Sequence, residues 1–68
     1  MSGLAFSSMR VGNRYCLVNH GEKTEFILEE VLSRGDYQLK DLYSLERYRM
    51  SDLIRYGRGE DFELSEMY

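Results

Sequence analysis

Four polar clusters that contain glycine constrain the fold of this chain more than any other feature of its sequence. They favour turns, because glycine accepts positive φ and because the short side chains of Asn, Asp and Ser bond to nearby backbone. The clusters cut the chain into short segments and lie at residues 11–13, 19–23, 33–36 and 57–61. The chain has no proline, and we find no linker or internal repeat, so we expect one domain.

Three segments between the clusters predict strands. Residues 14–18 (RYCLV) are rich in residues that suit a pleated sheet. Residues 36–41 alternate in polarity, with Tyr37 and Leu39 on one face. Residues 46–50 alternate as well, with apolar side chains inward and arginines outward, so we expect a hairpin between these last two segments.

Residues 24–32 (TEFILEEVL) fit either a helix or a strand. In a helix, Thr24 is the N-cap and four apolar side chains share one face, namely Ile27, Leu28, Val31 and Leu32. In a strand, Phe26 and Leu28 share one face and a bulge interrupts the pairing near residues 29–30. We favour the strand, because short turns join this segment to its neighbours.

The last part of the domain predicts a helical turn and a closing strand. Ser51 is placed to cap one turn of helix over residues 52–56, and Gly57 is placed to end it in a left-handed conformation. Residues 62–64 (FEL) then alternate and predict the last strand. The sequence therefore predicts an all-β fold with five strands and one short helical turn.

This order of elements resembles the small barrels of the Src-homology-3 and Tudor type. The segments that carry the resemblance are VGNRYCLV, DYQLKDL and ERYRMSDL. The resemblance implies a small five-stranded SH3-like barrel over residues 11–64 and, in Tudor-type domains, a partner-binding surface with an aromatic cage between loops. We expect residues 1–10 to be a flexible N-terminal segment and residues 65–68 to be a C-terminal tail.

Composition limits what such a domain can do. A chain of 68 residues buries only about 60% of the surface that its unfolded form exposes, so we expect a small core and no deep catalytic cleft. The single cysteine, Cys16, cannot form an intrachain disulfide, which favours a reducing compartment such as the cytoplasm. We find no signal-peptide pattern and no apolar run of about 18 residues, so we expect no membrane span.

Two glycine-containing motifs have simple structural interpretations. Gly57 and Gly59 lack the third glycine of a dinucleotide-binding fingerprint, because Phe62 occupies its place. Residues 34–36 spell the adhesion tripeptide Arg-Gly-Asp, but the same residues make an ordinary tight turn between strands. We therefore expect both motifs to turn the chain.

Metal-binding and catalytic sets are incomplete in this sequence. Cys16 and His20 are close together, but a zinc site needs about four ligands. Adjacent carboxylates occur at residues 29–30 and 60–61, and neighbours on a strand point to opposite faces, so neither pair converges on a substrate. We predict no metal, no cofactor and no enzymatic activity.

Arginines and tyrosines in the second half of the chain form the candidate binding surface, because both residue types are enriched at recognition hot spots. On the predicted strand, Arg47 and Arg49 project from one face about 6 to 7 Å apart. The candidate residues, called the Arg/Tyr set here, are Arg47, Arg49, Arg55, Arg58, Tyr43 and Tyr56. The alternative is that nearby carboxylates pair with these arginines and that the tyrosines are half-buried.

The sequence favours a non-catalytic interaction module. Such a module would hold a protein partner, or a second copy of itself, through an exposed sheet edge or the Arg/Tyr set. The alternative ligand is single-stranded nucleic acid, with tyrosines stacking on bases and arginines contacting phosphates. The net charge of −3 disfavours it: residues 34–58 carry six basic and four acidic side chains, but residues 59–68 add four acidic ones.

Overall fold

The protein is mainly β, as its sequence predicts. The computed structural model describes residues 4–68. Its five strands are β1 (Arg14–Asn19), β2 (Glu22–Val31), β3 (Tyr37–Asp41), β4 (Arg47–Arg49) and β5 (Glu63–Met67). The helical elements are short, namely the 3₁₀ turns η1 (Phe6–Ser8) and η2 (Ser33–Gly35) and the helix α1 (Met50–Leu53).

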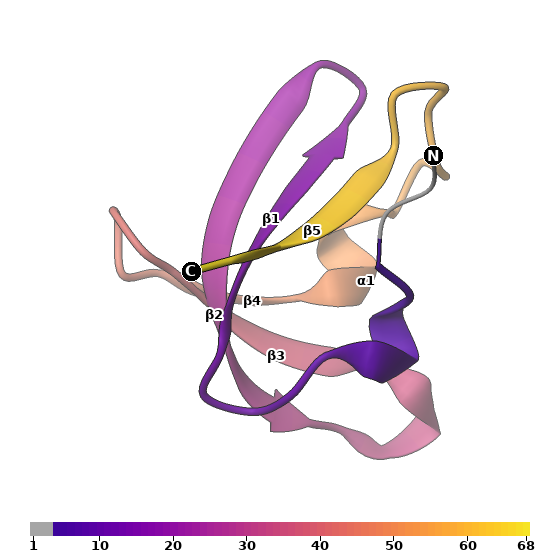
Figure 1. Ribbon diagram of the computed structural model, residues 1–68. Coiled ribbons are helices and arrows are strands. Elements are labelled where there is room, and N and C mark those ends of the chain that lie inside the picture. The colour runs from indigo at the N-terminus through magenta and orange to yellow at the C-terminus, as the bar shows by residue number, and fades with distance from the viewer. Residues whose placement is uncertain (1–3) are drawn as a thin grey trace.

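All five strands form one antiparallel sheet in the order β4-β3-β2-β1-β5. The strand predicted over residues 24–32 is confirmed, since it lies in β2, and the helix alternative is wrong. The pairing of β2 with β3 shifts register between Leu28 and Glu30, at the predicted bulge. A bulge bends a strand and increases its twist, and the sheet is strongly curved around β2 (Figure 1).

The sheet has two edges, β4 and β5. In residues 4–68 no strand pairing joins β4 to β5, so the sheet is open and closure into a barrel is not shown. The N-terminal segment covers part of one edge, because the backbone N–H of Leu4 donates to the carbonyl of Leu64 at 2.6 Å.

The core lies on the concave side of the curved sheet and is small. Alternating side chains supply most of it, in the pattern expected from a half-buried sheet. The buried apolar residues are Met9, Tyr15, Leu17, Phe26, Leu28, Leu39, Met50 and Leu64.

The ends of the chain take part in the fold beyond the range expected for the domain. Met9 belongs to the core although it precedes residue 11, and β5 continues past Leu64 to Met67. The expectation of a flexible segment over residues 1–10 falls in part outside the described residues.

The helical turn differs from the prediction in its position and in its cap. It spans Met50–Leu53 rather than residues 52–56, and the residue that precedes it is Arg49. The side chain of Asp52 accepts the backbone N–H of Arg49 at 3.0 Å, whereas Ser51 bonds to another turn. Gly57 has a φ of 87°, which confirms its predicted left-handed conformation. The prediction that Gly57 ends the helix is wrong, because α1 ends at Leu53 and its C-cap is Ile54.

A buried asparagine holds the connection between α1 and β5 against the end of β1. Asn19 is 7% exposed. Its Nδ2 donates to the carbonyls of Gly57 at 3.1 Å and Leu53 at 3.4 Å, and its Oδ1 accepts the backbone N–H of Gly59 at 2.7 Å. One side chain therefore satisfies three backbone groups that no strand pairs.

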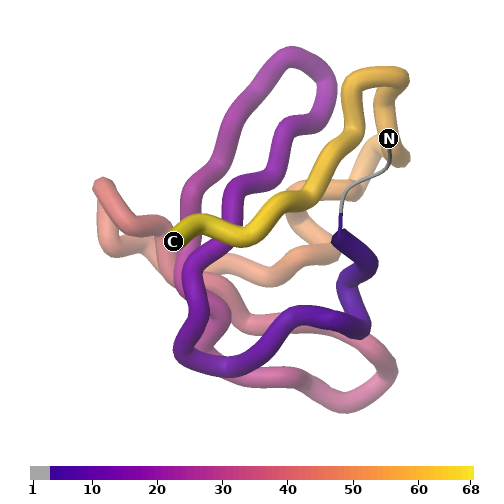
Figure 2. Tube along the Cα trace, in the orientation of Figure 1, coloured from indigo at the N-terminus to yellow at the C-terminus, as the bar shows by residue number. Residues whose placement is uncertain are grey.

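A second set of contacts joins the same connection to the β1–β2 turn. Asp61 accepts the backbone N–H of His20 at 2.9 Å and that of Gly21 at 2.7 Å. A Cβ atom at Gly59 would lie 2.8 Å from the ring of His20, so the glycine permits this close approach. Figure 2 shows the loop before β5, at the top of the trace, beside the β1–β2 turn.

Replacing Asn19 by alanine tests this account. The change leaves the part-buried N–H of Gly59 and the carbonyl of Leu53 without this partner, whereas the carbonyl of Gly57 keeps its contact with His20. We expect a loss of about 1–3 kcal/mol in the free energy of unfolding. Urea unfolding followed by circular dichroism measures it. The control is Asn13→Ala, which removes one part-buried bond to Glu66 and should cost less. Equal losses in the two variants would contradict the role given to Asn19.

Candidate functional site

A groove lies between the β2–β3 turn and α1, and we call it the β2–α1 groove. It has a volume of about 750 Å³. Its apolar lining comes from the N-terminal segment, the end of β2 and the helix region, through Phe6, Val31, Leu32, Met50 and Ile54. Val31 is 54% exposed, so the groove presents apolar surface to solvent.

The β2–β3 turn forms one wall of the groove, and its backbone is left-handed. Arg34 has a φ of 65° and Gly35 a φ of 77°, and the N–H of Leu32 donates to the carbonyl of Asp36 at 2.8 Å. The turn predicted for Arg34-Gly35-Asp36 is therefore confirmed. Arg34 adopts a conformation that is uncommon for residues other than glycine, and its side chain lines the groove.

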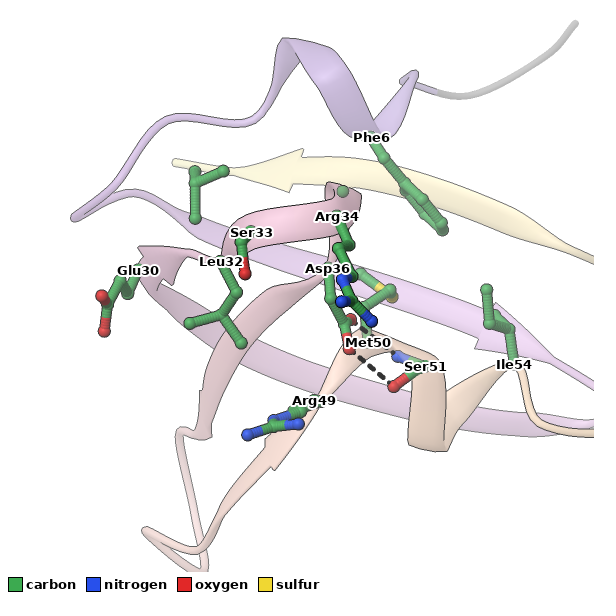
Figure 3. Close-up of a pocket in the computed structure, with 12 residues that line it drawn as sticks. Phe6, Glu30, Leu32, Ser33, Arg34, Asp36, Arg49, Met50, Ser51 and Ile54 are labelled. Atoms are coloured by element: carbon green, nitrogen blue, oxygen red, sulfur yellow. Dashed lines mark hydrogen bonds between the residues drawn. The ribbon is translucent and has the colours of Figure 1, made fainter.

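Asp36 joins the two walls of the groove. Its carboxylate accepts the backbone N–H of Ser51 at 3.1 Å and the hydroxyl of Ser51 at 2.7 Å (Figure 3). It also accepts the N–H of Tyr37 at 2.8 Å. Partial burial works to raise the pKa of Asp36, but these bonds and the nearby Arg49 together hold the pKa below its usual value. The carboxylate is therefore ionised at neutral pH.

Two guanidinium groups at the groove have no acidic partner in the described chain. Arg34 and Arg49 both line it, Arg34 from the β2–β3 turn and Arg49 from β4 (Figure 3). Among residues 4–68, the carboxylate pairs within 4.0 Å are Arg47 with Glu29, Arg55 with Asp52 and Lys23 with Glu25. The groove thus combines apolar surface with two guanidinium groups that have no carboxylate within 4.0 Å among residues 4–68.

The residues of the Arg/Tyr set lie at several separate places on the surface. Arg47 and Arg49 both project outward from β4, as predicted, but only Arg49 lines the groove. The Nε of Arg47 instead donates to the carboxylate of Glu29 at 2.8 Å on the outer face of the sheet.

Arg55 and Tyr56 follow α1 and contact each other, with the guanidinium 6.0 Å from the ring centroid. Arg55 also lies 3.6 Å from the carboxylate of Asp52. Tyr56 is 84% exposed. It lines a second, smaller hollow together with His20.

Arg58 and Tyr43 complete the set in two further places. The guanidinium of Arg58 lies 4.9 Å from the ring centroid of Phe6 and 4.5 Å from that of Phe62, in a cation–π arrangement. Tyr43 lies in the β3–β4 turn, and its hydroxyl donates to Glu25. Phe6 also lines the groove, so Arg58 is linked to the groove through its contact with Phe6. Arg49 lines the groove directly.

The cysteine and the histidine lie in separate environments. Cys16 is half-buried on the outer face of β1, and burial raises the pKa of its thiol. His20 is exposed in the β1–β2 turn, and its Nε2 lies 3.0 Å from the carbonyl of Gly57. Over the described part of the chain, no three His, Cys, Asp or Glu side chains are grouped as ligands for a metal ion.

Comparison with known proteins gives no relative: no family model matches the chain, and no curated protein or solved structure matches it significantly. Within residues 4–68, none of the helices has the length and apolar character needed to cross a membrane. Any functional conclusion therefore depends on the geometry described above.

The pH dependence of stability tests the contact between Asp36 and Ser51. A carboxylate with a lowered pKa in the folded state contributes stability above its unfolded pKa of about 3.9, and this contribution is lost as the pH falls through the folded pKa. We expect Asp36→Asn to be less stable than the wild type at about pH 7, and the difference to shrink below about pH 4. Thermal unfolding at both pH values measures it. A difference that stays constant with pH would contradict the assignment.

Proposed function

We propose that this chain is a non-catalytic binding module whose β2–α1 groove holds a short segment of a partner protein. The proposal depends mainly on one observation, which is exposed apolar surface beside two arginines that have no carboxylate partner in the described residues. The volume of the groove lies within the range of about 300–1,000 Å³ that is typical of ligand sites.

The chemistry of the groove favours an acidic and apolar segment. A guanidinium presents a fork of N–H donors that matches a carboxylate, and arginine is enriched where binding energy is concentrated. Asp36 does not compete for this role, because Ser51 and Tyr37 already occupy its oxygens. Arg34 and Arg49 are therefore available to carboxylates of a ligand, while Leu32 and Ile54 contact its apolar side chains.

The sheet edges are weaker candidates than the groove. Strand addition needs a free run of backbone groups, and short, charged edge strands oppose it. The edge strand β4 has only three residues, and two of them are arginines. On the opposite edge, the N-terminal segment already bonds to β5 through Leu4 and Leu64.

The strand order supports an SH3-like architecture as part of the proposal. Four strands form a meander, α1 follows β4, and the last strand returns beside β1. This is the order of elements in which the sequence resembles the Src-homology-3 and Tudor type. In this arrangement the groove lies at the end of the sheet where the β2–β3 turn and α1 meet.

Nucleic-acid binding through the Arg/Tyr set gains no support from the site. Tyr43, Arg47 and Arg55 each contact a carboxylate, and those negative charges would repel phosphates. The cytoplasmic location and the absence of catalysis stay predictions from the sequence.

Binding of designed peptides tests the proposed function. The probe is a labelled peptide in which one leucine and one tyrosine are flanked by glutamates, and its comparison peptide carries lysines instead. We expect the glutamate peptide to bind more tightly, with an affinity that falls as salt is added. The double variant Arg34→Asn with Arg49→Gln should bind it about three- to tenfold more weakly, since each exposed ion pair is worth up to about 1 kcal/mol. Fluorescence anisotropy measures both.

The control variant is Arg10→Gln with Arg14→Gln, which removes the same charge from two exposed side chains outside the groove lining. It should bind the glutamate peptide like the wild type at physiological salt. Equal affinity for the two peptides, or an equal loss in the two double variants, would overturn the proposed function.

A further inference from the structure

The turn between β3 and β4 ends in an exposed apolar tip. Tyr43 is 77% exposed and Leu45 is 60% exposed. Two large apolar side chains that are exposed together at the end of one hairpin are typical of an interaction site. We call residues 42–45 the hairpin tip.

The backbone of the hairpin tip is left-handed at a leucine, a residue type that disfavours this conformation. Leu45 has a φ of 63°. The left-handed region costs a leucine about 1–2 kcal/mol, whereas glycine or asparagine would adopt it readily. Among residues 4–68, burial of the Leu45 side chain offsets little of this cost, since that side chain is 60% exposed. Strain of this kind at an exposed apolar residue points to a contact outside the chain.

Hydrogen bonds hold the backbone of the hairpin tip in place. The Oδ1 of Asp41 accepts the backbone N–H groups of Tyr43 at 2.8 Å and Ser44 at 2.9 Å, and its Oδ2 accepts the hydroxyl of Tyr48 at 2.7 Å. The N–H of Leu45 donates to the carbonyl of Asp41 at 3.1 Å. A tip held in one conformation loses little entropy on binding.

The surroundings of the hairpin tip are acidic. Tyr43 donates its hydroxyl to Glu25, and the carboxylate of Asp41 lies at the base of the turn. Hydrogen bonds lower the pKa of Glu25 and of Asp41, so both are ionised at neutral pH. Glu46 is exposed directly after Leu45, and Lys23, which lies beside the tip, pairs with Glu25 at 3.4 Å.

This combination complements the β2–α1 groove, which joins exposed apolar surface to two arginines without an acidic partner in residues 4–68. We propose that the hairpin tip of one copy of this chain enters the β2–α1 groove of a second copy. Leu45 and Tyr43 would contact the apolar lining. Glu46, whose side chain is exposed and has no ion pair within residues 4–68, would face Arg34 and Arg49.

The inference depends on the proposed function, since it names the segment that the groove takes up. The contact joins two different surfaces, so each copy in a pair keeps one free tip and one free groove. Association of this kind is head-to-tail, and further copies add at both ends unless the rotation closes a ring. The interface is small, and we expect a weak contact with a Kd of about 0.1–1 mM.

Mixing two variants of the full chain tests this arrangement. The tip variant is Tyr43→Ala with Leu45→Asn, where asparagine keeps the left-handed backbone and removes the apolar side chain. The groove variant is Arg34→Asn with Arg49→Gln. We expect the wild type to grow in mass with concentration in sedimentation velocity, and each variant alone to associate about three- to tenfold more weakly.

An equimolar mixture of the two variants is the decisive sample. The intact tip of the groove variant fits the intact groove of the tip variant, so the mixture should form one-to-one dimers and nothing larger. A symmetric dimer through one shared surface would not be restored by mixing. The control Val11→Asn with Tyr68→Ala removes a similar pair of exposed side chains elsewhere, and it should associate like the wild type.

A mixture that stays monomeric at about 1 mM, or a wild type that stays monomeric at that concentration, would overturn the head-to-tail inference. The proposed function fails separately, because the tip variant keeps its groove and should bind the glutamate peptide as tightly as the wild type does. Thermal unfolding confirms that both variants are folded, and the tip variant should unfold at no lower temperature than the wild type.

Discussion

One carboxylate holds together the part of this protein on which its proposed function depends. Asp36 directly precedes the strand β3 and bonds to Ser51 in α1, which lies fifteen residues further along the chain. Within residues 4–68, these bonds are the direct polar link between the β2–β3 turn and the helix, which form the two walls of the groove. Because a core of eight buried apolar side chains cannot reach every loop, polar contacts of this kind position the surface.

Asp41 and Asp61 act in the same way at two other turns. Asp41 accepts two backbone N–H groups in the β3–β4 turn, and Asp61 accepts two in the β1–β2 turn. Some acidic side chains of the protein are therefore structural, because their carboxylates accept backbone N–H groups inside turns. Arg34 and Arg49 differ from this pattern, because they lie beside apolar surface without a carboxylate partner in the described residues. That difference makes the groove the best candidate for recognition.

The sequence predicts the sheet well, because alternation reports directly which side chains face the core. It places the bulge of β2 near residues 29–30 and the turns at the glycine clusters correctly. It assigns the cap of the helical turn wrongly, since Ser51 bonds to Asp36, a tertiary contact that no local pattern encodes. The groove has no sequence signal for the same reason, because its two arginines come from a turn and from a strand. The left-handed backbone of Leu45 has no sequence signal either.

The measurement that tests the central claim most directly is a dilution series of the unmodified protein, followed by nuclear magnetic resonance of its backbone amides. If the groove and the hairpin tip recognise each other, the amide signals of residues 34–36, 49–54 and 42–46 shift together as the protein is diluted, while those of β1 and β5 stay in place. Signals that do not change with concentration, or changes confined to the outer edge of β5, would contradict the account.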